Sequence, residues 1–124
     1  MIAEIIGEAE MIAVIFEVRI SPGRQQDYLD FAAALRTELE AVDGFLSVER
    51  FSSLTDSNRI LSLSFWRDEE AVRRWRTASR HRAAQRAGRA GIFSDYRLRV
   101  ASVLRDYGMR DREQAPGDSE GMLA

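Results

Sequence analysis

The sequence contains no cysteine and no lysine, and among its 124 residues there are one histidine, two tryptophans and two prolines. Without cysteine, the chain can form no disulfide, no thiolate nucleophile and no thiolate metal site. Without lysine, a Schiff-base lysine and the phosphate-binding lysine of a Walker motif are also excluded. All 18 basic residues are therefore arginine, and the 20 acidic residues bring the net charge to −2.

Long apolar runs are absent as well. The opening residues, MIAEIIGEAEM, lack the basic start and the apolar centre of a signal peptide, and no window approaches the roughly 20 apolar residues of a membrane span. A chain without cysteine fits the reducing cytosol. We therefore expect a cytoplasmic protein with no membrane partner, and the length is that of one domain.

The pattern of apolar residues alternates between strand-like and helix-like periods. The first β-branched run ends at Ser21-Pro22-Gly23, and the next segment repeats apolar residues at helical spacing until Gly44, which suits a helix end. We predict strands at 11–20, 45–54, 59–66 and 96–107, and helices at 24–43 and 68–89. The order βαββαβ predicts an α+β, ferredoxin-like fold with a four-stranded antiparallel sheet.

The second helix does not keep one apolar face. Trp75 shares its side of the helical wheel with Arg82 and Arg86, which a buried stripe would not accept. We expect the helix to break at 77–79, where Ser79 can cap a new turn. The following segment then has a small polar face made of His81, Ala84, Gln85 and Gly88.

Both faces of the predicted sheet carry apolar residues. One face of the first strand is entirely apolar and is expected to lie under the helices: Ile12, Val14, Phe16, Val18 and Ile20. The other face begins with Met11, Ala13 and Ile15, although the uncovered face of such a sheet is normally polar. We therefore predict a homodimer in which a second copy covers this face.

Polar residues of the sheet suggest a patch. If the strand registers are as expected, Glu17 and Glu49 point to the same face as Ser62, Ser64 and Trp66 and form a polar patch with Arg19 inside the barrel. The alternative is an internal ion pair that fixes the register of the dimer. Neither reading makes a metal site, because a lone histidine and scattered carboxylates lack the spacing of metal ligands.

Several segments together resemble a known family. They are FEVRISPGR, DGFLSVERF, ILSLSFWRDEEAVRRWRTASRHRAAQ and the closing RDYG. From about Met11 to Gly108 the chain resembles the antibiotic biosynthesis monooxygenase family, whose members pair as dimeric α/β barrels. This predicts a domain at 11–108, an N-terminal extension at 1–10 and a flexible tail at 109–124.

The resemblance separates the family's activities residue by residue. Haem-degrading members use an asparagine, a tryptophan and a histidine at positions that correspond to Phe16, Trp75 and Gln85, so only the tryptophan is retained. Glutamine is a poor iron ligand, which makes haem degradation a third choice. The polyketide oxygenases resemble this chain at Trp66 but carry an asparagine where Ser62 stands; a hydroxyl can still hydrogen-bond a phenolate.

Our first hypothesis is a monooxygenase without cofactor or metal that acts on a small planar aromatic molecule such as a phenol, hydroquinone or quinol. His81 would be the base, and Ser62 or an arginine would steady the anion. The expected walls and contacts of the site are Trp66, Trp75, Gln85, Phe51, Glu17 and Arg19.

The second hypothesis is a dimeric binding or housekeeping domain without chemistry, in which the tryptophans are core residues and His81 lies on a helix surface. Nucleic acid is not an expected partner. The arginines between residues 67 and 89 come with no RNA-binding motif, and the chain as a whole is not basic.

Overall fold

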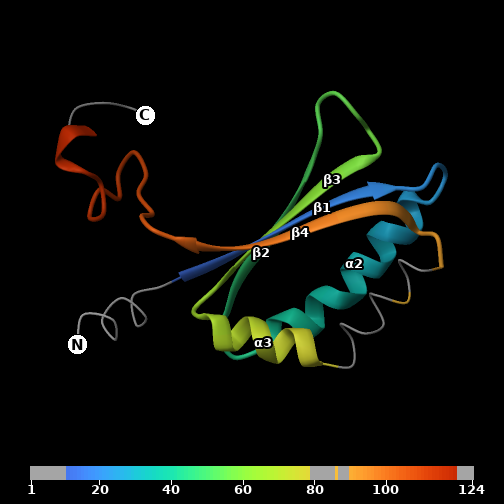
Figure 1. The fold of residues 1–124 in the computed structure, drawn as a ribbon, viewed down its shortest axis with the longest axis horizontal. Coiled ribbons are helices and arrows are strands. Elements are labelled where there is room, and N and C mark those ends of the chain that lie inside the picture. The colour runs from blue at the N-terminus through green and yellow to red at the C-terminus, as the bar shows by residue number, and fades with distance from the viewer. Residues whose placement is uncertain (1–10, 79–85, 87–89, 120–124) are drawn as a thin grey trace.

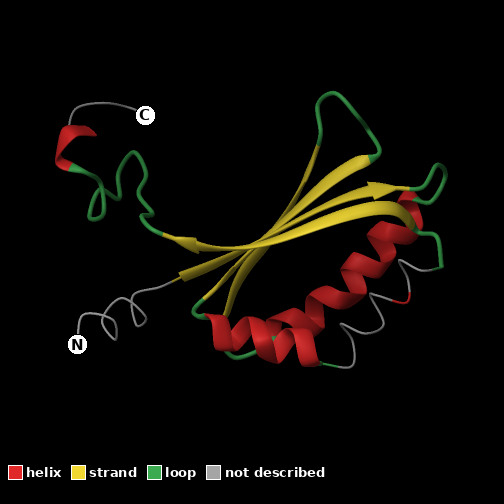
Figure 2. Ribbon diagram, in the orientation of Figure 1, coloured by secondary structure: helices red, strands yellow, loops and turns green. Residues whose placement is uncertain are grey.

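The computed structural model describes residues 11–78, 86 and 90–119. The elements, in chain order, are β1 (Met11–Ile20), α2 (Gln25–Glu40), β2 (Phe45–Ser52), β3 (Arg59–Trp66), α3 (Glu69–Thr77), β4 (Phe93–Val103) and the short 3-10 helix η1 (Gly117–Ser119). One antiparallel sheet has the strand order β2-β3-β1-β4. Both α-helices lie on one side of it (Figures 1 and 2), so the predicted ferredoxin-like α+β fold is confirmed.

Helix α2 forms where the apolar stripe predicted it, and it buries Tyr28, Ala32 and Leu39. The helix ends at Glu40 with Ala41 as its C-cap, earlier than the predicted end at Gly44. Gly44 lies in the turn that follows, and its φ of +94° suits glycine far better than other residues. A Cβ atom at Gly44 would come within 2.6 Å of the Ala71 Cβ. The turn after α2 is therefore pressed against the start of α3.

Helix α3 starts and ends at recognisable signals. The Asp68 side chain accepts a hydrogen bond of 2.9 Å from the Ala71 backbone N–H and so caps the N-terminus. At the other end Ala78 is extended, with ψ 147°, and stops the helix after Thr77. The predicted break at 77–79 is confirmed, while the predicted capping role of Ser79 lies outside the described residues.

The core between sheet and helices consists of two clusters. One gathers Ile12, Leu39, Val48, Trp66, Ala71 and Val72. The other gathers Val18, Ile20, Tyr28 and Ala32. The alternate residues of β1 from Ile12 to Ile20 thus face the helices, as the alternation predicted. In the parts of the chain that the structure describes, no helix is long and apolar enough to cross a membrane.

The last strand differs from its prediction at 96–107, since β4 starts at Phe93 and ends at Val103. Its bounds follow β1, because Phe93 pairs with Ile20 and Val103 pairs with Met11. Beyond the ladder, the Asp106 backbone N–H donates to Gln114 Oε1 at 2.8 Å. The Arg112 guanidinium lies 5.3 Å from the centre of the Tyr107 ring. The flexibility of residues 109–124 stays a prediction.

Candidate active site

The strand registers divide the predicted site residues between the two faces of the sheet. Ser62 is opposite Phe16 on β1, whereas Glu17 is opposite the next residue along β3, Leu61. Side chains alternate between faces with a period of two, so Ser62 and Glu17 point in opposite directions. The residues that face the helices with Phe16 include Ser62, Ser64 and Trp66.

The prediction that Glu17 and Glu49 share a face with Ser62, Ser64 and Trp66 is therefore wrong. Glu49 is opposite Leu63 and Phe51 is opposite Leu61, so both lie on the uncovered face with Glu17 and Arg19. The physical reason is register: pairing displaced by a single residue moves every side chain to the other face. Sequence alternation within one strand does not determine that register.

Trp66 is a core residue in this structure. Its side chain is 1% exposed, and its indole N–H donates a hydrogen bond of 2.9 Å to the buried Ser64 hydroxyl. The ring also meets Phe45 edge to face, with centroids 5.2 Å apart. Trp66 is thus part of the core beneath the helices, and a catalytic role for it stays a prediction.

The structure describes Trp75, whereas the predicted base, His81, lies outside the described residues. Trp75 is half-buried and packs against the core cluster to which Trp66 belongs. His81 and Gln85 lie outside the described residues. Their predicted roles as base and substrate contact stay predictions.

A row of side chains crosses the middle of the helix-covered face, one from each strand. Arg50 on β2 is opposite Ser62, Ser62 is opposite Phe16, and Phe16 is opposite Leu98 on β4. We call these four residues the central row. None of them is fully buried, whereas Val48 and Ser64 are buried on one side of the row and Val18 on the other. The central row is therefore only partly covered by the rest of the described chain.

Arg50 is the residue of the row that sequence reasoning missed. Its Nε donor is buried, and among the described residues it has no hydrogen-bond acceptor. Buried donors nearly always have partners, so an exception of this kind calls for an explanation. The sequence signal was its position. Arg50 is two residues from Val48, so the two side chains point to the same face of β2, and Val48 is apolar.

An apolar strip on β4 continues the central row. Tyr96, Leu98 and Val100 lie on the helix-covered side of the sheet but are 59%, 44% and 47% exposed. Phe16 contacts the Tyr96 ring with centroids 5.6 Å apart. This strip gives the central row an apolar end opposite the charged end at Arg50, which suits a small ligand with one polar group.

The uncovered face holds a network of ion pairs instead. Glu17 accepts from Arg99 at 3.1 Å and from Arg59 at 3.5 Å, and Arg19 pairs with Asp56 at 2.6 Å. A cavity of about 160 Å³ lies beside these pairs. Among the described residues, no group of three or more histidine or acidic side chains has an arrangement that could hold a metal ion.

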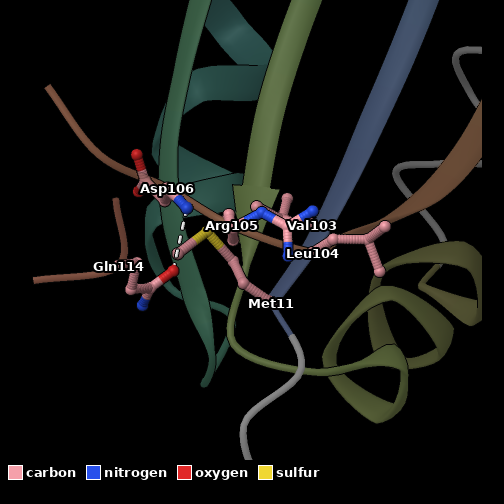
Figure 3. A pocket seen from close by; sticks show the side chains of 6 residues that line it. All are labelled: Met11, Val103, Leu104, Arg105, Asp106 and Gln114. Carbon is pink, nitrogen blue, oxygen red and sulfur yellow. Dashed lines mark hydrogen bonds between the residues drawn. The ribbon is translucent and has the colours of Figure 1, made fainter. Parts of the chain in front are cut away.

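A larger cavity, of about 300 Å³, lies where the chain leaves β4. Figure 3 shows it lined by Met11, Val103, Leu104, Arg105, Asp106 and Gln114. The hydrogen bond from the Asp106 backbone to Gln114 closes one side of it. None of the predicted site residues that the structure describes lines this cavity, and neither does any residue of the central row.

The corner between β3 and α3 is held by surface charges. Arg67 donates to Asp43 at 3.1 Å and to Asp68 at 3.2 Å. The hydrogen bond from Arg67 lowers the pKa of Asp43, and the backbone N–H of Ala71 lowers the pKa of Asp68. These groups position the start of α3, which carries Trp75.

Comparison with known proteins identifies the family. The sequence model of the family described as "antibiotic biosynthesis monooxygenase" matches residues 11–87, more than half of the chain. The chain belongs to this family. The match spans all elements from β1 to α3 and includes three of the four residues of the central row, Arg50, Ser62 and Phe16.

Two curated relatives are similar in sequence. The jasmonate monooxygenase ABM of Pyricularia oryzae is 50% identical over 93 residues, which are 75% of this chain and 43% of that protein. An uncharacterised Bacillus subtilis protein, YqjZ, is 37% identical over 62 residues, which are 50% of this chain and 53% of that protein. The chain therefore spans about half the length of the curated relatives it matches.

Solved structures share the fold. SnoaB from Streptomyces nogalater, a cofactor-independent oxygenase, superposes with a TM-score of 0.70 at 14% identity, covering 79% of this chain and 97% of that one. A protein from Deinococcus radiodurans described as an antibiotic biosynthesis monooxygenase has a TM-score of 0.72 at 11% identity, with the same coverage. At such identities the likeness concerns the fold alone.

Proposed function

We propose that this chain is a monooxygenase that oxidises a small, planar, electron-rich aromatic molecule without a metal or a flavin. The observation that carries the proposal is the central row, a partly exposed strip with a hydroxyl at Ser62 and apolar surface at Phe16 and Leu98. The family and the 50% identity to a protein named as a monooxygenase support the reaction type.

The chemistry needs no external reductant if the substrate supplies the electrons. A hydroquinone and dioxygen give a hydroxyquinone and water: one oxygen atom enters a ring C–H bond and the other leaves as water. All four electrons come from the substrate. The protein's part is to remove a phenol proton, hold the resulting anion and keep the ring next to dioxygen.

The residues divide these tasks. His81 is assigned as the base, because an imidazole with an ordinary pKa near 6.5 can accept a phenol proton at neutral pH. The Ser62 hydroxyl donates to the substrate oxygen, and Trp75 and Gln85 border the ring. Trp66 acts indirectly, since its hydrogen bond to Ser64 stiffens the strand that carries Ser62.

Oxygen consumption and product mass test this function. The purified chain is screened with hydroquinones, naphthols and other phenols under ¹⁸O₂, and turnover should place one ¹⁸O atom in the product. We expect His81→Ala to lower kcat by about 100-fold and Ser62→Ala by about 10-fold. Ser57→Ala, which alters an exposed loop serine, should leave turnover unchanged.

Two results would count against the proposal. Turnover that survives both His81→Ala and Ser62→Ala would remove these residues from the mechanism. Binding of the aromatic compounds without oxygen consumption would instead identify a ligand-binding domain.

We further propose that a second copy of the chain covers the uncovered face of the sheet. Ile15, Leu61, Leu63 and Phe65 form an apolar centre on that face, and Phe51 is 43% exposed beside them. The ion pairs of Glu17 border this centre. Glu17, Arg19 and Phe51, expected from the sequence to contact substrate, are thereby reassigned to the interface between copies.

A further inference from the structure

We propose that Arg50 binds a carboxylate on the substrate, so that the site accepts small apolar acids through one charged end. This inference rests on the proposed function only for the location of the site between sheet and helices. Its own basis is the place of Arg50 opposite Ser62 on the helix-covered face, together with a buried Nε donor that has no acceptor among the described residues. An arginine at an apolar strand position needs an acceptor, and the described part of the protein supplies none to this atom.

The guanidinium favours a carboxylate over other acceptors. It presents planar, forked N–H donors that match the two oxygens of a carboxylate, and a charge-assisted pair of this kind is among the strongest hydrogen-bonded contacts. A phenol offers one oxygen and is neutral near pH 7. The geometry of the donor therefore selects for an acid.

The central row also sets the dimensions of the ligand. From Arg50 on β2 to Leu98 on β4 the row crosses three strand spacings, roughly 14 Å in all. A carboxylate at the β2 end leaves room for an apolar body over Phe16 and Leu98. The exposed strip of Tyr96, Leu98 and Val100 is then the surface that this body covers.

The position of Ser62 connects this binding mode with the chemistry. Ser62 is the neighbour of Arg50 across the β2–β3 ladder and the neighbour of Phe16 across the β3–β1 ladder. A ligand held at its carboxylate by Arg50 therefore passes its body directly over the Ser62 hydroxyl. Arg50 orients the substrate, and Ser62 contacts the part of the substrate that is next to the carboxylate.

Binding of matched acid and ester pairs tests the inference. The probes are jasmonate with methyl jasmonate and 2-naphthoate with methyl 2-naphthoate, titrated by calorimetry into the unmodified chain and into Arg50→Met, Arg50→Lys and Arg36→Gln. The unmodified chain should bind each acid about 10- to 100-fold more tightly than its ester. Arg50→Met should abolish this preference, Arg50→Lys should reduce it, and Arg36→Gln, which alters an exposed arginine of α2, should keep it.

Thermal unfolding separates binding from a structural role. Because Arg50→Met keeps the aliphatic stem and removes an unpaired buried donor, its Tm should equal or exceed that of the unmodified chain. If Arg50→Met does not fold, Arg50 has a structural role and the inference is wrong.

Three other results would also overturn the inference about Arg50. They are equal affinity for acid and ester, a preference for the acid that survives Arg50→Met, and no binding of any of the four probes. If Arg50→Met weakens the binding of 2-naphthol as much as that of 2-naphthoate, Arg50 binds any oxygen ligand, and the selection for a carboxylate is refuted. Oxygen consumption plays no part in these measurements, so failure of the oxygenase proposal remains a separate result.

Discussion

At the scale of single residues, Gly44 shows how one position can serve two constraints. Its φ of +94° lies in the left-handed region, which costs a residue with a side chain energy that glycine avoids. Its missing side chain also leaves room for Ala71, since a Cβ would come within 2.6 Å of the Ala71 Cβ and 3.3 Å of the Arg67 guanidinium. Gly44 thus allows the end of α2 and the start of α3 to meet.

We predict that Gly44→Ala lowers the free energy of unfolding by about 2–4 kcal/mol, through backbone strain and steric contact together. Gly23→Ala is the matched control. Gly23 also has a positive φ, of +78°, but a Cβ there would meet nothing within 4 Å, so only the strain is expected. Urea denaturation measures both, and equal losses in the two variants would refute the steric contribution.

Arg50 is a second residue at which the sequence shows only part of the structural role. The charge at an apolar strand position was visible in the sequence, but the missing acceptor was not. A hydrogen bond depends on which side chains approach from elsewhere in the chain. Sequence reasoning therefore found Ser62, Trp66 and Trp75 through a family resemblance, and it overlooked the arginine that is opposite Ser62 on the next strand.

At the scale of elements, the start of α3 depends on its N-cap residue, Asp68. Asp68 accepts the Ala71 N–H, and this hydrogen bond is the leading cause of its lowered pKa. A carboxylate whose pKa is lower in the folded state stabilises the fold above its unfolded pKa of about 3.9. That contribution disappears as the pH falls through the folded value.

We predict that Asp68→Ala lowers the free energy of unfolding by about 1 kcal/mol at pH 7. The difference from the unmodified chain should shrink as the pH drops below about 4, because the unmodified Asp68 then becomes protonated. Asp68→Asn keeps a capping oxygen without the charge and should stay near the unmodified stability at pH 7. Denaturant titrations across pH 3–7 check this, and a loss in Asp68→Ala that does not change with pH would contradict it.

At the scale of the whole molecule, the sheet has one face under the helices and one face that is open (Figure 2). The open face combines an apolar centre with the ion pairs of Glu17. A second copy related by two-fold symmetry would place the same centre against itself and remove it from water. The open face is therefore the expected site of dimer formation.

We predict that Leu63→Arg, at the centre of the open face, converts a dimer into a monomer, because a buried unpaired charge at the interface is costly. Leu29→Arg, which alters an exposed leucine of α2, should leave the dimer intact. Size-exclusion chromatography with light scattering distinguishes the two masses. A monomeric unmodified chain, or a dimeric Leu63→Arg variant, would refute this interface.

The sequence by itself determined the elements and their order, because these depend on local signals. The apolar periods, the turn at Ser21-Pro22-Gly23 and Gly44 predicted β1, α2, the hairpin and the break after α3. The bounds of β4 did not follow from local signals, because a strand ends where its partner ends, and the partner of β4 is β1, far away in the sequence.

Only the tertiary structure decided which side chains share a face. The register between β1 and β3 placed Glu17 with Leu61 and Ser62 with Phe16, and so divided the residues expected to form one site. The register between β2 and β3 set Arg50 opposite Ser62, and in the described part of the chain its Nε has no acceptor. Register depends on pairing between strands that are far apart in the sequence, and a displacement of one residue turns every side chain to the other face. The pattern within a single strand therefore does not determine it.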